Sequence, residues 1–346
     1  MEYVKLGNYI NIKTGKLDAN KNTVNGKYPF FTCSKVTLRI NTYSYDCECV
    51  LVAGNGEINA KYYNGKFDAY QRTYIIESKD KSKLLVKYIY YFMLSYINIL
   101  KRKSIGGVIK YIKLNNLTEA IIPLISIAEQ IKIINYFEKY NKYVDYNKIL
   151  LNELDNIVKS QFIEMFGTIN MNQISNNWEL IDKYCKIYTG TTPSSSDESN
   201  WNGDIPWVTP SEINTDSFYI YSTIRKITEK GRKSKSLDIM PVNTVLLSTR
   251  APIGKVAIAG VPMTCNQGFK NFVCCEKLNH IFLYVLLKNN KSYLNSLGSG
   301  TTFLEISRSK ISKIKIPIPP IELQNKFASF VEQIDKSKYF GGVSYA

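Results

Sequence analysis

The chain has 346 residues, 45% hydrophobic and 21% charged, which is enough for two domains with cores of their own and ordinary for a soluble globular protein. Its formal net charge of +16 indicates a polyanionic partner such as nucleic acid, although an AT-rich gene, rich in Lys, Asn, Ile and Tyr codons, would also supply part of that charge. No signal peptide is visible and the most apolar run, residues 89–100, is too short to span a bilayer, so we expect a cytoplasmic protein.

The opening phrases of the chain return in its second half. Three pairs of segments align at a growing offset: KLGNYINIKTG (5–15) with LIDKYCKIYTG (180–190), GKYPFFTCS (26–34) with GDIPWVTPS (203–211), and VLVAGNGEINAKYY (50–63) with VLLSTRAPIGKVAI (245–258). The growing offset indicates extra loop sequence in the second copy, chiefly residues 214–236. A repeat of this length predicts two equivalent domains and not a solenoid of small units.

Each copy continues with a helical segment, residues 84–101 in the first and 278–296 in the second. Each then has a polar loop, SIGG (104–107) and SLGSGTT (296–302), followed by a short strand that runs into a proline. Short strands, one or two helices and a long terminal helix in each half predict an α+β fold.

A long helix is predicted near the middle of the chain. Ser126 and Glu129 match a capping box at its start, and Gly167 is a stop signal at its end. Between them apolar residues recur every seven positions, at Phe137, Val144, Leu151, Val158 and Met165. About 40 residues at 1.5 Å each give a helix of roughly 60 Å, longer than a small domain is wide.

This helix is interpreted as a spacer between two domains, with one long core helix as the alternative. The spacer is favoured because IPLISIAEQIKIINYFEKYNK (122–142) aligns with IPIPPIELQNKFASFVEQIDK (316–336) near the C-terminus, with Gln130 opposite Gln324. We therefore predict four segments: a first domain (1–124), a central helix (125–167), a second domain (168–318) and a shorter C-terminal helix (319–346).

A search for catalytic residues finds little. His280 is the single histidine and opens the apolar run HIFLYVLL, where a role at a helix start is expected. Neither a dinucleotide-binding nor a P-loop motif occurs, and no His, Cys or Asp spacing suits a metal. The seven cysteines form no CxxC pair and are interpreted as small hydrophobic residues in a reducing compartment. We expect no catalytic residue, metal or cofactor in this chain.

Side chains that read base edges or hold phosphates gather in corresponding loops of the two copies. A solvent-exposed surface position is the alternative for any one of them. The candidates in the first copy are Asn55, Asn59, Lys61, Tyr70, Gln71, Arg72, Lys103 and Lys110. Those in the second copy are Arg250, Lys255, Asn266, Gln267 and Lys270.

The motifs together resemble the specificity subunit of type I restriction–modification systems. The phrase TGTTPSSSDESNWNGDIPWVTPSEI (189–213) is similar to the start of that family's target-recognition domain, and later phrases follow in the family's order: STRAPIGKVAI (248–258), NQGFK (266–270), GSGTTFLEISRSKI (298–311) and IPIPPIELQNKF (316–327). These motifs add Thr191, Thr192, Ser211 and Thr302 to the candidate DNA-binding residues. The resemblance covers the whole chain and is weaker in the first half.

The resemblance implies two target-recognition domains, each reading half of a bipartite DNA site, held apart by two antiparallel helices. The helices would dock methyltransferase subunits, which carry S-adenosylmethionine, and restriction subunits would add ATP- and magnesium-dependent cleavage. The competing hypotheses are a coiled-coil scaffold that binds no DNA and a nuclease with an unrecognised site.

One feature departs from the family pattern. The C-terminal helix is only about half as long as the central one, because Gly341 and Gly342 interrupt it. A naturally truncated gene, a recombination product and an artificially shortened chain all remain open. A short second helix would leave the central helix uncovered from Val144 to Met165. We therefore expect a docking surface for a methyltransferase subunit or a second copy of the chain, formed by Val144, Leu151, Leu154 and Val158.

Overall fold

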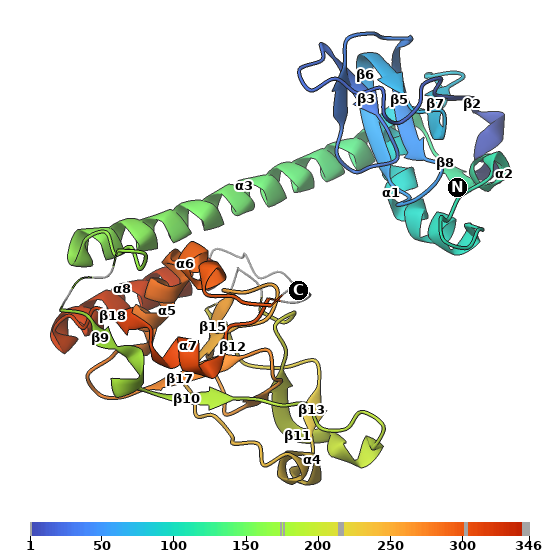
Figure 1. Ribbon diagram of the computed structural model, residues 1–346. Coiled ribbons are helices and arrows are strands. Elements are labelled where there is room, and N and C mark those ends of the chain that lie inside the picture. Colours follow the sequence, from blue (N-terminus) through green and yellow to red (C-terminus); the bar gives the residue numbers. More distant parts are fainter. Residues whose placement is uncertain (1, 174, 176, 214–217, 301–303, 341–346) are drawn as a thin grey trace. The chain divides into compact units, whose positions relative to one another are not determined.

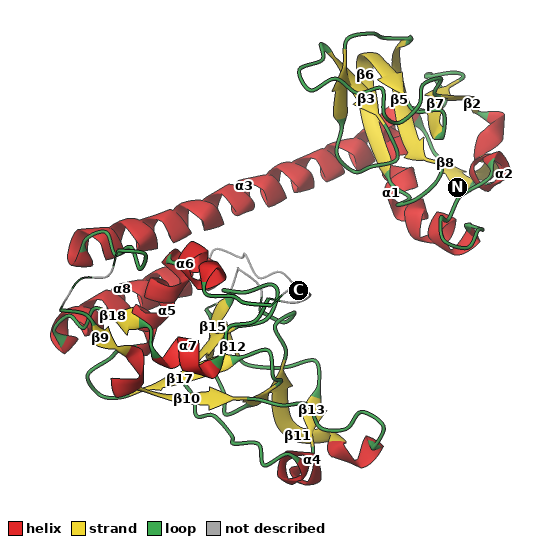
Figure 2. Cartoon of the chain, viewed as in Figure 1, coloured by secondary structure: helices red, strands yellow, loops and turns green. Residues whose placement is uncertain are grey.

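The computed structural model describes residues 2–173, 175, 177–213, 218–300 and 304–340. The chain divides into two compact units, residues 1–145 and 146–346 (Figure 1). Each unit combines a mixed β-sheet with helices, which confirms the predicted α+β class (Figure 2). Among the described residues, no helix is both long and apolar enough to cross a membrane.

The first unit is built on a six-stranded sheet in the order β2-β7-β5-β6-β3-β4, with a separate pair β1-β8. Its elements are β1 (Glu2–Lys5), the 3₁₀-helix η1 (Leu6–Asn8), β2 (Ile10–Thr14), β3 (Tyr28–Phe31), β4 (Leu38–Ile40), β5 (Tyr45–Ala53), β6 (Ala60–Ala69), β7 (Thr73–Ser78), α1 (Val86–Lys103), α2 (Leu114–Thr118) and β8 (Ile121–Leu124).

The central strand β5 is buried on both faces, which explains its continuous apolar run. Val50 and Val52 pack with α1 in one core cluster, whereas Cys49 and Leu51 face a second cluster on the other side of the sheet. Successive side chains of a strand point to opposite faces, so a strand between two cores needs apolar residues at every position.

The second unit repeats this architecture. Its elements are β9 (Glu179–Leu180), η2 (Ile181–Lys183), β10 (Cys185–Thr189), η3 (Glu198–Asn200), β11 (Trp201–Val208), β12 (Tyr219–Ile220), β13 (Lys226–Ile227), α4 (Glu229–Ser234), β14 (Val245–Leu247), β15 (Val256–Ala259), β16 (Thr264–Cys265), β17 (Lys270–Cys274), α5 (His280–Asn289), α6 (Lys291–Ser296), α7 (Arg308–Ser312), β18 (Lys315–Ile316) and α8 (Ile321–Phe340).

The six-stranded sheet of the first unit corresponds to a five-stranded and a three-stranded sheet of the second, in which β12 is an additional strand. This confirms the two similar domains expected from the repeat. The order β2-β7-β5-β6 returns as β10-β17-β14-β15, and β6-β3-β4 returns as β16-β11-β13. The single strand β6 is thus divided into β15 and β16. The segment between them contains Pro262, which has no N–H to donate to a neighbouring strand.

Two details differ from the sequence-based expectation. The extra sequence of the second copy forms β12, β13 and α4 within its described part and is not a plain loop. The helical segment 278–296 is two helices, because Asn290 separates α5 from α6. The Asn290 side chain accepts a hydrogen bond from Met171 N at 3.0 Å and donates one to Leu286 O at 2.9 Å.

The long helix α3 (Ile127–Phe166) begins and ends as predicted. Ser126 and Glu129 form the capping box: Ser126 N lies 3.0 Å from Glu129 Oε2, and Glu129 N lies 3.3 Å from Ser126 Oγ. Gly167 follows the last helical residue with a φ of 77°, a left-handed conformation that glycine adopts without steric cost.

A buried glutamine fastens the start of each terminal helix to its own unit. In the first unit, Gln130 accepts a hydrogen bond from Leu85 N at 2.9 Å and donates to Lys83 O and Ile125 O at 2.8 and 3.0 Å. In the second unit, Gln324 repeats all three bonds with Asn279 N, Lys277 O and Pro319 O at 2.9, 3.2 and 2.7 Å. Both glutamine side chains are fully buried, and each side-chain amide bonds three backbone groups of its own unit.

The prediction of an exposed docking surface on the C-terminal half of α3 is wrong for Val158. This residue is 5% exposed and belongs to the core of the second unit, together with Phe162 of α3 and Phe327 of α8. The rings of Phe162 and Phe327 lie 5.4 Å apart. Because α8 and α5 pack against this end of α3, an aspartate at Val158 would disturb the core and could not report on docking alone. Val144, Leu151 and Leu154 are partly exposed.

Candidate nucleic-acid interface

Four loops of the first unit meet next to one end of β5: the segments 15–18, 54–56, 70–72 and 105–111. Backbone hydrogen bonds join them. Gly54 N donates to Arg72 O at 2.8 Å, Gln71 N to Leu17 O at 2.9 Å, and Gly56 N to Lys110 O at 2.8 Å. We call this meeting of loops the loop junction of the unit.

The loop junction of the first unit encloses a cavity of about 550 Å³. Four of the predicted DNA-binding residues line this cavity: Asn55, Tyr70, Gln71 and Arg72. Three further side chains line it as well: Thr14, Tyr74 and Tyr111. Asn55 and Arg72 donate no side-chain hydrogen bond to any described residue, so their amide and guanidinium groups are available to a ligand. Polar donors beside aromatic walls suit a nucleic acid.

The second unit builds the same junction from corresponding segments. Thr249 N donates to Gly268 O at 2.7 Å, which is the counterpart of the bond from Gly54 N to Arg72 O. Thr192 Oγ1 lies 2.6 Å from Gln267 Oε1, whereas Gln71 in the first unit contacts Asp18 at 3.1 Å. Of the predicted residues, the structure brings Thr192, Arg250, Gln267 and Lys270 together here.

A glycine without room for a side chain closes each junction. A methyl group on Gly15 would overlap the carbonyl oxygens of Ala69 and Tyr70, and one on Gly190 would overlap those of Cys265 and Asn266. These oxygens belong to the backbone and cannot move away by a rotamer change. This explains why glycine recurs at this position in both copies.

We expect Gly15→Ala to lower the free energy of unfolding of the first unit by about 2–3 kcal/mol, because overpacking against backbone shifts the strands that carry the junction. Gly107→Ala is the matched control, since a methyl group there meets no atom within 4 Å. Urea unfolding of both variants measures the difference. Equal stability of the two variants would show that β2 can move away freely.

Other predicted residues of the first unit use their donors within the unit. Asn59 donates to Cys33 O and Glu57 O, both at 2.8 Å, and Lys61 Nζ donates to Ser34 O at 2.6 Å. Burial lowers the pKa of Lys61. Lys103 Nζ lies 3.3 Å from Tyr96 OH at the end of α1. Lys110 is exposed and belongs to the loop junction through its carbonyl group.

In the second unit, four predicted residues form internal contacts. The Thr191 carbonyl accepts a hydrogen bond from Trp207 Nε1 at 3.1 Å, and Ser211 Oγ lies 2.8 Å from Thr209 Oγ1. Lys255 Nζ donates to Pro210 O and Ile213 O at 3.2 and 2.9 Å. Asn266 Oδ1 accepts from Gly268 N at 2.9 Å, which shapes the turn between β16 and β17. Thr302 lies outside the described residues.

The loop junctions also contain residues that were not among the sequence-based candidates, among them Thr14, Tyr74, Tyr111 and Glu305. Tyr111 forms backbone bridges with Ile105, after α1, and with Asn55, after β5. Glu305 forms the equivalent bridges with Ser299, after α6, and with Arg250, after β14. The sequence did carry a signal for both. They stand 194 positions apart, the offset at which the terminal helices align.

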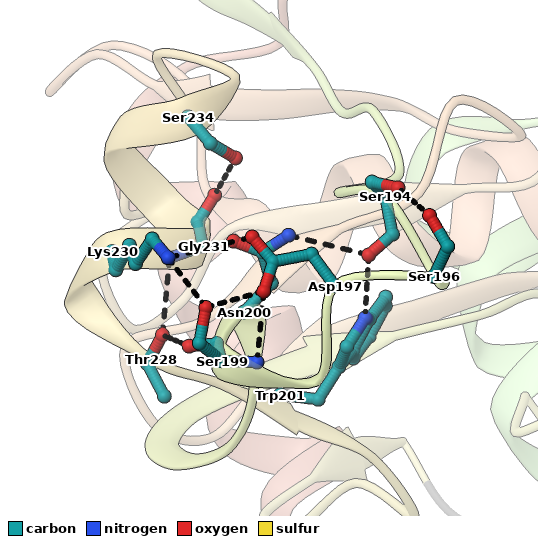
Figure 3. A network of polar contacts seen from close by, with 10 residues as sticks. All are labelled: Ser194, Ser196, Asp197, Ser199, Asn200, Trp201, Thr228, Lys230, Gly231 and Ser234. Atoms are coloured by element: carbon teal, nitrogen blue, oxygen red, sulfur yellow. Dashed lines mark hydrogen bonds and ion pairs between the residues drawn. The ribbon is translucent and has the colours of Figure 1, made fainter.

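The loop between β10 and β11 is held by a polar network (Figure 3). Asp197 accepts from Ser199 N at 3.1 Å and lies 3.4 Å from Lys230 Nζ, which also donates to Ser199 Oγ at 2.6 Å (Figure 3). Asn200 and Trp201 both donate to Ser194 O, at 3.2 and 3.0 Å. Through Lys230, the network attaches residues 197–199 of this loop to α4.

The two tryptophans of this segment form part of the core. Trp201 and Trp207 are 7% and 3% exposed, and their rings meet edge to face at 5.1 Å. The Arg225 guanidinium lies 3.4 Å from the centre of the Trp201 ring. A cation stacked on a buried indole stabilises the pair, so these aromatic rings support the loop and do not face a ligand.

His280 is the first residue of α5, as expected for a helix-start histidine. Its Nε2 lies 3.4 Å from Tyr219 OH, and burial lowers its pKa. Among the described residues, no group of three or more His, Cys, Asp or Glu side chains is placed to hold a metal ion.

Comparisons with known proteins identify the family to which the chain is similar. The family model described as "Type I restriction modification DNA specificity domain" matches residues 1–156 and 177–339. The MjaIX specificity subunit of Methanocaldococcus jannaschii is 38% identical over 184 residues, which cover 52% of this chain and 43% of that protein. The EcoDI specificity subunit of Escherichia coli is 28% identical over 362 residues, covering 96% of this chain and 80% of that protein.

The fold is also found in a solved structure. The specificity subunit of a type I restriction–modification system from M. genitalium superposes with a TM-score of 0.60 at 16% identity, covering 97% of this chain and 89% of that one. At this identity the likeness concerns the fold alone. Because the family model matches both copies of the repeat, the chain belongs to the family of type I restriction–modification specificity subunits.

Proposed function

We propose that this chain recognises duplex DNA sequence-specifically, with each unit reading one half of a bipartite site through its loop junction. The observation that carries the proposal is the repeated junction itself. Two units of one chain place amide and cationic side chains on the same loop framework. Asn55 and Gln71 of the first unit correspond in position to Arg250 and Gln267 of the second, and Arg72 and Lys270 add a cation nearby in each. These side-chain types read base edges in the major groove.

The proposed complex also contains methyltransferase subunits, docked on α3 and α8. Partly exposed apolar side chains of α3, among them Val144, Leu151 and Leu154, would contribute to this contact, and a second copy of the chain is the alternative occupant. S-adenosylmethionine, ATP and magnesium would bind to methyltransferase and restriction partners. In this proposal the chain performs no reaction of its own and selects the site.

DNA affinity is expected to fall steeply as salt rises, because each lysine or arginine that neutralises a phosphate releases counterions. Fluorescence anisotropy with a labelled duplex containing the target, between 50 and 200 mM salt, measures the slope of log affinity against log salt. Lys110→Ala should reduce that slope by about 1 if Lys110 contacts a phosphate.

Lys132→Ala on α3 is the matched control, because it removes the same charge from an exposed position outside the loop junction. A folded parent protein whose binding does not change over this salt range would contradict nucleic-acid recognition and favour a scaffold role.

A further inference from the structure

The two loop junctions have equivalent backbone pairings but carry different side chains. Asn55 pairs with Tyr111 in the first unit, and Arg250 pairs with Glu305 in the second, through the same backbone bridge. The next residue of each framework corresponds as well: Ile112 N donates to Gly54 O and Ile306 N donates to Thr249 O, both at 2.9 Å. One framework therefore carries two different sets of polar groups.

In the second unit, Glu305 holds two cations. Its Oε2 accepts from Arg250 Nε at 2.9 Å, and its Oε1 lies 3.5 Å from Lys270 Nζ. The Lys270 side chain is 8% exposed and the Arg250 side chain 44% exposed. Lys270 is thus the buried counter-charge of the carboxylate, and Arg250 is the cation that reaches solvent.

The carboxylate fixes Arg250 by one edge only. Among the described residues, none accepts a hydrogen bond from the Nη1 or Nη2 atom of Arg250, so this edge of the guanidinium keeps a pair of donors for a ligand. Two parallel donors match the O6 and N7 acceptors on the major-groove edge of guanine. A guanidinium oriented in advance also loses less side-chain entropy when it binds.

A base is the better partner for this arginine than a phosphate. Glu305 lies against the guanidinium and offsets part of the positive charge that a phosphate would meet there, which reduces the gain from binding an anion. The neutral edge of a base depends on the geometry of the donors and is less affected by that carboxylate. In the first unit Asn55 stands in the place of Arg250, and its bridge partner is Tyr111 where the second unit has Glu305. An asparagine amide matches the N6 and N7 atoms of adenine.

We propose that Arg250, oriented by Glu305, reads a guanine in the half-site of the second unit, and that Asn55 reads an adenine in the half-site of the first. Glu305 is a positioning residue that acts through Arg250. The inference rests on the proposed function, because it names the bases that the two junctions select.

The test uses the full chain assembled with a methyltransferase partner and a library of duplexes randomised at each half-site in turn. Arg250→Ala should remove the guanine preference at one position of one half-site, with a loss of about 10- to 100-fold for guanine-containing duplexes. Asn55→Ala should remove an adenine preference in the other half-site only, which makes each variant the control of the other.

Glu305→Gln should weaken the same guanine preference about 10-fold without changing the other half-site, and Glu305→Asp should restore part of it. A residue that merely supported the fold would lower binding to all duplexes alike. Because Arg250 is exposed, Arg250→Ala tests the assignment even if removal of Glu305 destabilises the second unit. Thermal unfolding of each variant checks folding.

Three results would overturn the assignment: an unchanged preference in Arg250→Ala, an equal loss for all duplexes, or Asn55 and Arg250 acting on the same half-site. A parent complex that selects no sequence at all is a different outcome, since it would refute the proposed function as well.

Discussion

Gln324→Ala should lower the free energy of unfolding of the second unit by about 3 kcal/mol, because it removes a fully buried side chain and leaves three partly buried backbone groups without their partner. The lost partners are Asn279 N, Lys277 O and Pro319 O, which Gln324 satisfies at 2.9, 3.2 and 2.7 Å. Each unsatisfied group costs about 1–3 kcal/mol, and water entering the space of the missing side chain returns part of this.

Hydrogen exchange of backbone amides measures the effect unit by unit. In Gln324→Ala, the amides of α5 should lose protection while those of α1 keep theirs, and Gln130→Ala should show the reverse. Gln333→Ala on α8 is the matched control, because this side chain is exposed and its loss should change stability by less than about 0.5 kcal/mol. Equal protection of α5 in Gln324→Ala and Gln333→Ala would mean that the three backbone groups find other partners.

The repeat and the ends of α3 could be predicted because local rules determine them. A capping box, a terminal glycine and an uninterrupted helical segment act over a few residues. The matching glutamines at 130 and 324 were visible as identical letters at one offset. Their common role was not, because it depends on where Lys83 and Lys277 lie after folding.

Whether Val158 is buried or exposed could not be predicted from the seven-residue period of the helix. The seven-residue repeat shows that this face of α3 is apolar, but it does not show what covers the face. The structure places Phe327 of α8 and Phe282 of α5 around Phe162, one turn further along the same face. Because α5 also covers this part of α3, the length of α8 alone does not determine how much of the helix is exposed.

Part of the candidate site could be predicted from the sequence, and the rest depends on contacts that form only in the folded structure. Loops adjacent to buried strands brought Asn55, Gln71 and Arg72 into one cavity, and the equivalent loops brought Arg250 and Gln267 together. Lys255 had the right chemistry, but its ammonium group binds two backbone carbonyls instead. Glu305 was missed because a carboxylate is not itself a group that binds DNA, and its role depends on its position beside Arg250.

Inserting five base pairs between the two half-sites should reduce specific binding by about 100-fold or more. Both loop junctions belong to one chain, and α3 is a continuous helix with residues in each unit. Once one half-site is bound, the second binding event is intramolecular, and such linkage raises affinity by about 10²–10⁴ when the geometry allows both contacts. Five base pairs turn one half-site by about half a helical turn, so simultaneous contact would be lost.

Gel-shift titration of the complex with the parent duplex, the five-base-pair insertion and a ten-base-pair insertion measures this effect. The longer insertion restores the rotational phase but keeps the half-sites one turn further apart, and it therefore separates rotation from distance. A five-base-pair insertion placed outside the site is the control and should bind like the parent duplex. If the internal insertion also bound like the parent, the two units would read DNA independently, and the bipartite arrangement would have to be abandoned even though each loop junction still selected its own sequence.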